Sequence, residues 1–118
     1  MQLMLSGDSL GRVVGAIAHN GAQATVTGSD GFSAVADLRT AVESAVADGL
    51  GECFWQEAMV EYRWLFHREG NVMRIAILSS LGTLTGWEHL FWAECDVEEF
   101  QNVMHKAIEA FGVLAPQR

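Results

Sequence analysis

Ser9 is the residue whose surroundings most directly suggest catalysis, because it lies in the block Gly7-Asp8-Ser9-Leu10, just after a short apolar segment at residues 2–5. A serine hydroxyl becomes a nucleophile when a base removes its proton and nearby donors stabilise the oxyanion that forms. Glycine, aspartate and serine also favour tight turns, for separate backbone reasons. The block therefore predicts either a turn or the nucleophile of a small hydrolase.

The same four residues resemble the block that gives the GDSL lipases and esterases their name. That resemblance implies a nucleophilic Ser9 after a first strand, with its base supplied by an Asp-x-x-His block near the C-terminus. No Asp-x-x-His block occurs in these 118 residues, and the chain is far shorter than the α/β domain of that family. A small serine hydrolase, or a small-ligand binder using the turn at residues 7–10, is therefore the alternative function.

Histidine, cysteine and glutamate side chains could in principle form a metal site, from His67, His89, Cys95 and Glu88. None of these residues has the spacing of paired ligands on a helix, and the two histidines fall on separate expected strands. Cys53 and Cys95 do not form a C-x-x-C motif, so we expect two buried, reduced thiols. The sequence predicts no metal and no cofactor.

The charge balance of the chain restricts its partners, because 15 acidic residues stand against 7 basic ones and the formal net charge is −8. Nucleic-acid binding depends largely on neutralising phosphates, so an acidic chain disfavours nucleic acid and, for the same reason, an anionic membrane surface. No apolar run approaches the roughly 18–20 residues of a membrane span. The first residues also lack the basic segment of a signal peptide, so we expect a cytoplasmic protein that forms a single domain over residues 1–118.

The central predicted element is a β-hairpin over residues 62–80 that turns at Gly70-Asn71. Glycine supplies the positive φ of the first central position in a type II′ turn, which places Phe66 opposite Ile75 and Trp64 opposite Ile77. Because side chains alternate along a strand, the aromatic and branched residues share one face and the charged residues share the other. The sequence therefore fixes a buried and an exposed face for this hairpin.

The remaining elements follow from local signals. Asn20-Gly21 predicts a second hairpin between residues 12–19 and 22–27. Ser33 is the expected N-cap of a helix that runs to about residue 48, where Gly49 suits the left-handed C′ position. Residues 50–56 are consistent with either a loop or the beginning of a strand.

The C-terminal part is predicted to contain a strand over residues 87–95 and a helix from Asp96 to Gly112. Asp96 and Glu99 have the spacing of a capping box, and an apolar stripe follows the helical period. The complete prediction is an α+β fold with one antiparallel sheet of about six strands, in the order βββα–βββα, and two helices packed on one face. The repeated order hints at an internal duplication.

The predicted strand over residues 87–95 also carries the expected contact surface. Alternation places Trp87, His89 and Phe91 on one face, which we expect to be buried, and Glu88, Trp92 and Glu94 on the other. A partly exposed tryptophan beside carboxylates is typical of protein contact surfaces. We therefore predict a non-catalytic, acidic module that binds another protein, either a basic one or a second copy of itself, through Trp87, Glu88, Trp92 and Glu94.

Residues 57–112 resemble small uncharacterised bacterial α+β proteins, through the run from Glu61 to Ile75, the run from Trp92 to Phe100 and the closing amphipathic helix. Some proteins of that appearance neutralise toxins as immunity proteins, so the resemblance implies a binding or inhibitory role without assigning any residue to it. A further alternative is a sheet that is open on one face and holds a small apolar ligand.

Overall fold

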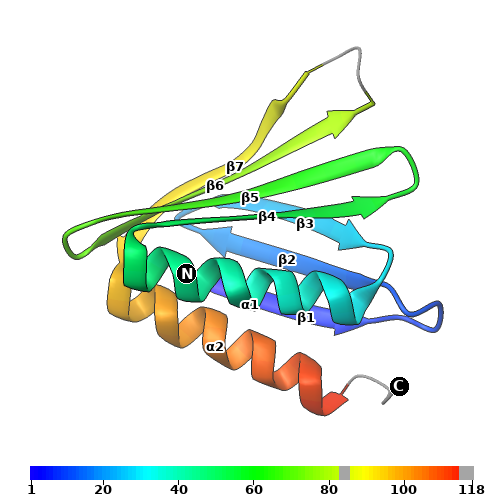
Figure 1. Cartoon of the computed structure of the whole chain (residues 1–118), viewed down its shortest axis with the longest axis horizontal. Coiled ribbons are helices and arrows are strands. Elements are labelled where there is room, and N and C mark those ends of the chain that lie inside the picture. The colour runs from blue at the N-terminus through cyan, green and yellow to red at the C-terminus, as the bar shows by residue number, and fades with distance from the viewer. Residues whose placement is uncertain (83–85, 115–118) are drawn as a thin grey trace.

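The computed structural model describes residues 1–82 and 86–114, where the chain forms an α+β fold (Figure 1). The elements within these two ranges follow in the order β1 (Gln2–Gly7), β2 (Val13–His19), β3 (Ala22–Gly28), α1 (Gly31–Asp48), β4 (Leu50–Glu57), β5 (Val60–Glu69), β6 (Val72–Leu81), β7 (Glu88–Asp96) and α2 (Val97–Leu114). The order is therefore βββα–ββββα. The additional strand is β4, in the segment that local signals left open.

The strands form two antiparallel sheets, β1-β2-β3 and β4-β5-β6-β7, and the predicted single sheet of about six strands is wrong. Tight turns fix the pairing inside each hairpin, but they do not decide how strands separated by a helix are placed. Here α1 separates β3 from β4, and the two sheets meet where the Ser29 amide donates to the Gln56 carbonyl at 2.8 Å.

Both predicted turns are confirmed. Asn20 and Gly21 have φ angles of 49° and 88°, as a type I′ turn requires, and Gly70 has a φ of 59°. The predicted partners also pair: Phe66 lies opposite Ile75 and the other predicted pairs follow in the same register. Local turn chemistry therefore determined which faces of these hairpins are buried.

The ends of α1 agree with the prediction at one terminus only. Asp30, rather than Ser33, is the N-cap, because its side chain accepts a hydrogen bond from the Ser33 amide at 3.2 Å. The helix begins at Gly31, whose amide donates to the Gly11 carbonyl at 2.8 Å. At the other end Gly49 adopts the predicted left-handed conformation, with a φ of 93°.

The predicted capping box of α2 does not form. The Asp96 carboxylate accepts from the amide of Glu98 at 3.1 Å, while Glu99 pairs with the N-terminal ammonium of Met1. The helix also continues through Gly112 to Leu114, beyond its predicted end. A partner that is distant in sequence has therefore replaced the local one.

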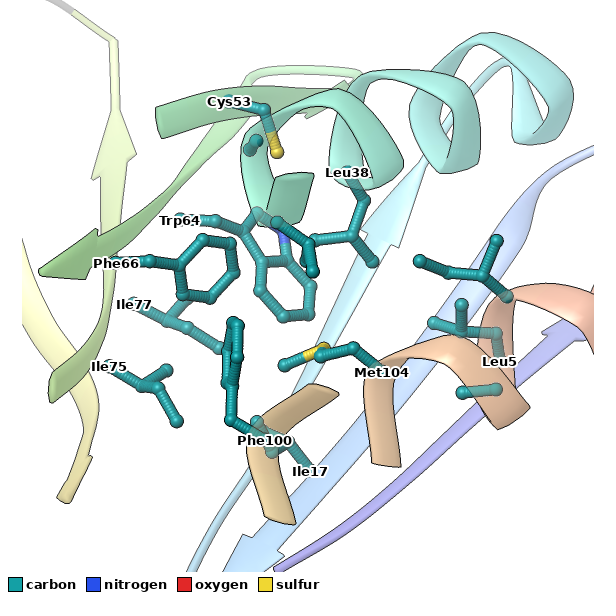
Figure 2. Close-up of a cluster of buried hydrophobic side chains, with 14 of the residues drawn as sticks. Leu5, Ile17, Leu38, Cys53, Trp64, Phe66, Ile75, Ile77, Phe100 and Met104 are labelled. Atoms are coloured by element: carbon teal, nitrogen blue, oxygen red, sulfur yellow. The ribbon is translucent and has the colours of Figure 1, made fainter. Parts of the chain in front are cut away.

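Both sheets and both helices share one apolar core. Figure 1 shows the two helices side by side, with the four-stranded sheet along one side of the pair. Trp64 and Phe66 point from β5 towards α2, where the rings of Phe66 and Phe100 lie 5.1 Å apart (Figure 2). The face of the four-stranded sheet that bears Trp64 is therefore its inner face, and the opposite face, which the helices do not cover, is its outer face.

Candidate functional site

The Gly7-Asp8-Ser9-Leu10 block forms the turn between β1 and β2. The Asp8 carboxylate accepts hydrogen bonds from the amides of Leu10 and Arg12 at 2.9 and 3.0 Å. It also accepts from the Arg12 guanidinium at 2.7 Å, and that guanidinium donates in turn to Glu57 at 2.9 Å. These bonds give Asp8 a structural role: it closes the turn and, through Arg12, joins it to the end of β4.

The environment of Asp8 favours its charged form. The hydrogen bond from the Arg12 amide is the largest cause that lowers the pKa of the Asp8 carboxyl, and the charged Arg12 side chain adds to this effect. Ser9 is exposed, and across residues 1–82 and 86–114 no hydrogen bond joins it to a histidine. The geometry of the turn therefore supplies no base for Ser9 from the described residues.

The four residues considered as a metal set lie apart. His67 on β5 and Arg74 on β6 are register partners on the outer face of the sheet, whereas Cys95 is buried on the inner face. His89 pairs with Leu78 at the other end of β7. Among the residues that the structure describes, no three His, Cys, Asp or Glu side chains gather where they could hold a metal ion.

Both cysteines are buried free thiols, as predicted. Burial raises the pKa of Cys53 to about 12, and the nearby carboxylates of Asp37 and Glu52 act in the same direction. Burial also raises the pKa of Cys95 to about 11, with a further contribution from Glu99. Because the thiolate is the reactive form, both side chains behave as core residues at neutral pH.

Strand β7 carries a β-bulge that changes which residues reach the outer face. Phe91 pairs with Ile77, but the next pair on β6 is Leu78 with His89, so one residue of β7 is left over between them. Phe91 is buried on the inner face, as predicted. The bulge places His89 with Leu78 on the outer face and Glu88, the partner of Ser79, on the opposite side, which reverses the predicted faces of both residues.

The two tryptophans of the predicted contact surface both reach solvent. Trp92 lies on the outer face of β7 with 53% of its surface exposed, next to its register partner Ala76. Trp87 precedes β7 and is 40% exposed. Glu94 lies on the same face as Trp92, and its carboxylate is 3.6 Å from the Arg74 guanidinium. The outer face therefore brings together three of the four predicted contact residues.

Trp87 does not stand alone, because it packs against a residue of β4. The rings of Trp87 and Phe54 lie 6.1 Å apart, and the Arg63 guanidinium carbon lies 5.9 and 5.8 Å from their centroids. The Arg63 Nε atom donates to the Glu52 carboxylate at 2.8 Å. Cation–π contacts and the ion pair together hold these four side chains in one arrangement.

Apolar side chains are spread across the outer face, and Arg63 lies between Phe54 and Leu78. Because side chains alternate between the two faces of a strand, each of β4, β5, β6 and β7 directs at least one apolar side chain to the outer face. We call this surface the apolar band; it consists of Phe54, Leu65, Ala76, Leu78, Trp87 and Trp92. All six side chains are exposed or half-buried.

Sequence reasoning missed Phe54 as a member of the apolar band and Arg63 as the cation that contacts its rings. Cys53 and Trp55 are buried on the inner face, so Phe54 between them points outward. This alternation of inward and outward side chains could be read from the sequence, but residues 50–56 were not assigned to a strand. Arg63 was correctly placed on the exposed face of its hairpin, yet its ring partners come from β4 and from the approach to β7, which the sequence does not bring together.

A second candidate surface is a hollow on the outer face of the three-stranded sheet, with a volume of about 720 Å³. It lies over small side chains of β2 and β3 and includes Met4, which is 69% exposed. The hollow is widely open, whereas small-molecule sites normally enclose most of their ligand. Its open shape would bury less of a small apolar ligand than an enclosed pocket would, so it is the weaker candidate for such a site.

No described helix is long and apolar enough to cross a membrane. Comparison with models of protein families, with curated proteins and with solved structures finds no match to this chain.

Proposed function

We propose that this chain is a non-catalytic, cytoplasmic module that binds another protein through the outer face of its four-stranded sheet. The observation that carries the proposal is the apolar band, which includes two partly exposed tryptophans on the face that the helices leave uncovered. Large apolar side chains gathered on an exposed face often mark a binding site. Tryptophan and arginine also dominate the energetically important positions of protein interfaces.

The arrangement of Phe54, Arg63 and Trp87 supports the same proposal. Their ring and cation contacts hold the side chains in place before any partner arrives. Ordering a flexible side chain on binding costs roughly 0.5–1.5 kcal/mol, so a preformed cluster binds with less loss. Glu88 points to the other side of β7, and we therefore assign the contact to Trp87, Trp92 and Glu94 without it.

The test compares three forms of the protein as immobilised baits. Wild type, Trp92→Ser and Met4→Ser are exposed to a soluble extract of the source cells, and retained proteins are identified by mass spectrometry. Trp92 and Met4 are both exposed, but they lie on different sheets, so Met4→Ser controls for a general loss of apolar surface. We expect a protein that wild type and Met4→Ser retain and Trp92→Ser loses.

The bait variants must be folded for this comparison, which their thermal unfolding verifies. Because Trp92 is 53% exposed, its replacement removes few core contacts and leaves the unfolding temperature nearly unchanged. Identical sets of retained proteins from all three baits would contradict the proposed surface. A retained basic protein would indicate the toxin-binding role that the net charge of −8 permits, and a retained copy of this chain would indicate self-association.

A further inference from the structure

We infer that the partner of the outer face is a basic protein that places an arginine or lysine side chain on Trp92, Glu94 and Asp96, an inference that rests on the proposed function. These three residues lie on the outer face of β7, because Ala93 and Cys95, which separate them, are buried on the inner face. Strand β7 is an edge strand of its sheet. We call the three side chains the β7 patch.

The first argument is the charge of the outer face, which is acidic overall. Five carboxylates and two guanidinium groups lie on this face, those of Glu52, Glu61, Glu69, Glu94 and Asp96 and those of Arg63 and Arg74, so three negative charges are in excess. A nucleic acid, an anionic membrane or an acidic protein would add to this excess. A neutral partner would remove water from the carboxylates without replacing it. A cationic partner is the one that compensates them.

The second argument is where this excess lies. Arg74 is 3.3 Å from the Glu69 carboxylate and 3.6 Å from the Glu94 carboxylate, so one guanidinium serves both. Asp96 follows on the same face of β7, and it forms no ion pair with any residue that the structure describes. Three carboxylates at this end of the sheet therefore share a single cation, and two of them belong to the β7 patch.

The opposite edge of the sheet shows how such a patch binds a cation. On β4, Glu52 and Phe54 are two positions apart on the outer face. Arg63 from the neighbouring strand lies over the Phe54 ring, with 5.8 Å between the guanidinium carbon and the centroid, and its Nε atom donates to Glu52 at 2.8 Å. A carboxylate and an aromatic ring with this spacing thus hold one arginine together.

Strand β7 repeats this pairing of ring and carboxylate without a cation over the ring. Trp92 and Glu94 are also two positions apart on the outer face, and Trp92 is 53% exposed. Within residues 1–82 and 86–114, the guanidinium that lies over aromatic rings belongs to Arg63, and none lies over Trp92. Tryptophan is the strongest cation–π partner among the aromatic side chains. An arginine or lysine from a partner can therefore lie on this ring and donate to the carboxylates beside it.

The experiment uses a short, fluorescently labelled peptide of alternating arginine and threonine as the probe. Its arginines share one face of an extended strand, with the spacing of alternate residues on β7. The matched probe has citrulline in place of arginine, which keeps the shape and removes the charge. Fluorescence anisotropy gives the Kd of each peptide for the purified full chain. We expect the arginine peptide to bind at least about tenfold more tightly.

Ionic strength provides a second readout of the same binding. The Debye length falls from about 30 Å at 0.01 M to about 8 Å at 0.15 M ionic strength, so added salt screens the attraction between the peptide and the acidic face. We therefore expect the arginine peptide to bind more weakly in the higher salt and the citrulline peptide to change little.

Two double variants locate the binding, because each changes the formal net charge from −8 to −6. Glu94→Gln/Asp96→Asn neutralises the β7 patch, and asparagine still serves as an N-cap for α2. Glu43→Gln/Asp48→Asn removes the same kinds of charge from exposed positions on α1, away from the outer face. We expect the first variant to weaken the arginine peptide at least about tenfold and the second less than about twofold. Trp92→Ser should also weaken it, and thermal unfolding verifies that each variant is folded.

Three results would overturn the inference: equal affinity for the two peptides, binding of the arginine peptide that salt leaves unchanged, or equal losses in the two double variants. The comparison of immobilised baits separates this inference from the proposed function. A protein that is captured through Trp92, and that both double variants retain alike, would overturn the cationic partner and leave the proposed binding surface intact. Captured proteins that do not depend on Trp92 would overturn both.

Discussion

Replacing Gly51 with alanine would place a methyl group inside the backbone of α1. A Cβ atom built at Gly51 lies 1.9 Å from the Ala41 carbonyl oxygen, 2.8 Å from the carbonyl carbon and 3.1 Å from the Ala45 Cβ. The shortest carbon–oxygen contacts in proteins are about 3.3 Å, so helix and strand must separate by about 1.4 Å. Neither neighbour is the flexible end of a side chain. The helix as a whole has to move.

The expected cost follows from this displacement. Inserting a methyl group into a packed core typically costs about 1–3 kcal/mol, even where side chains can adjust. Here the movement also loosens the packing of Leu38, Ala41 and Ala45, which are buried on the face of α1 that meets the core. We therefore expect Gly51→Ala to lower the free energy of unfolding by at least about 3 kcal/mol, a large fraction of the total stability of an ordinary domain.

The same chemical change at Gly112 provides a matched control. Gly112 lies near the end of α2, and a Cβ atom built there meets nothing within 4 Å. Alanine is favoured over glycine in a helix by roughly 0.5–1 kcal/mol, so Gly112→Ala should stabilise the protein slightly. Urea unfolding followed by circular dichroism measures both variants. A loss below about 1 kcal/mol for Gly51→Ala would refute the close packing of β4 against α1.

Three further predictions concern the core and the turn at residues 7–10. The Trp55 indole donates to the Ala34 carbonyl at 2.8 Å, whereas the buried indole N–H of Trp64 has no partner among the described residues. Phenylalanine at position 55 should therefore cost about 1 kcal/mol more in urea unfolding than at position 64, and equal costs would contradict this assignment. Cys53 and Cys95 should label with a thiol reagent only after unfolding. Because the folded state raises both thiol pKa values, their contribution to stability is fully present below the ordinary thiol pKa of about 9. It should be lost as pH rises towards 11–12. An alkaline stability profile that Cys53→Ala leaves unchanged would argue against this pH dependence. Ser9→Ala should retain any hydrolysis of a simple ester that wild type displays, and a loss of turnover would favour the hydrolase alternative.

The sequence predicted the hairpins because the signal for a tight turn is local. Asn20-Gly21 and Gly70-Asn71 each lie between strands whose alternation agrees with the turn, so turn and register support the same pairing. The buried faces of β5 and β6 followed directly. The α+β class and the antiparallel pairing within each hairpin could therefore be predicted from the residues alone.

The division into two sheets could not be predicted, because it depends on contacts between distant segments. The start of α1 illustrates this difficulty: glycine disfavours a helix, yet the helix begins at Gly31, where a side chain would lie 3.0 Å from the Gly11 carbonyl oxygen. The close approach of another loop outweighs the local preference. Glu99 likewise pairs with Met1, which is 98 positions away, instead of forming the local capping box.

The candidate site was predicted only in part, for a similar reason. Trp92 and Glu94 are on the outer face, as their alternation with buried neighbours indicated. The bulge between the pairs of Ile77 and Leu78 inserts a residue that no sequence signal marks, and it exchanges the faces of Glu88 and His89. The cluster of Phe54, Arg63 and Trp87 depends on the approach of segments that are far apart in the chain.

The position of Trp55 has a consequence for the synthesis of this chain. Its indole lies against two glycines of the first sheet, because Cβ atoms built at Gly15 and Gly28 would come within 3.4 and 3.5 Å of the ring, and β1 itself packs against α2. Strand β1 therefore finds its covering helix only after the residues of α2 have been made. We expect nascent chains that stop before α2 to expose β1–β3 to proteases and chaperones. The 118-residue chain should fold slowly for its size, in one cooperative step.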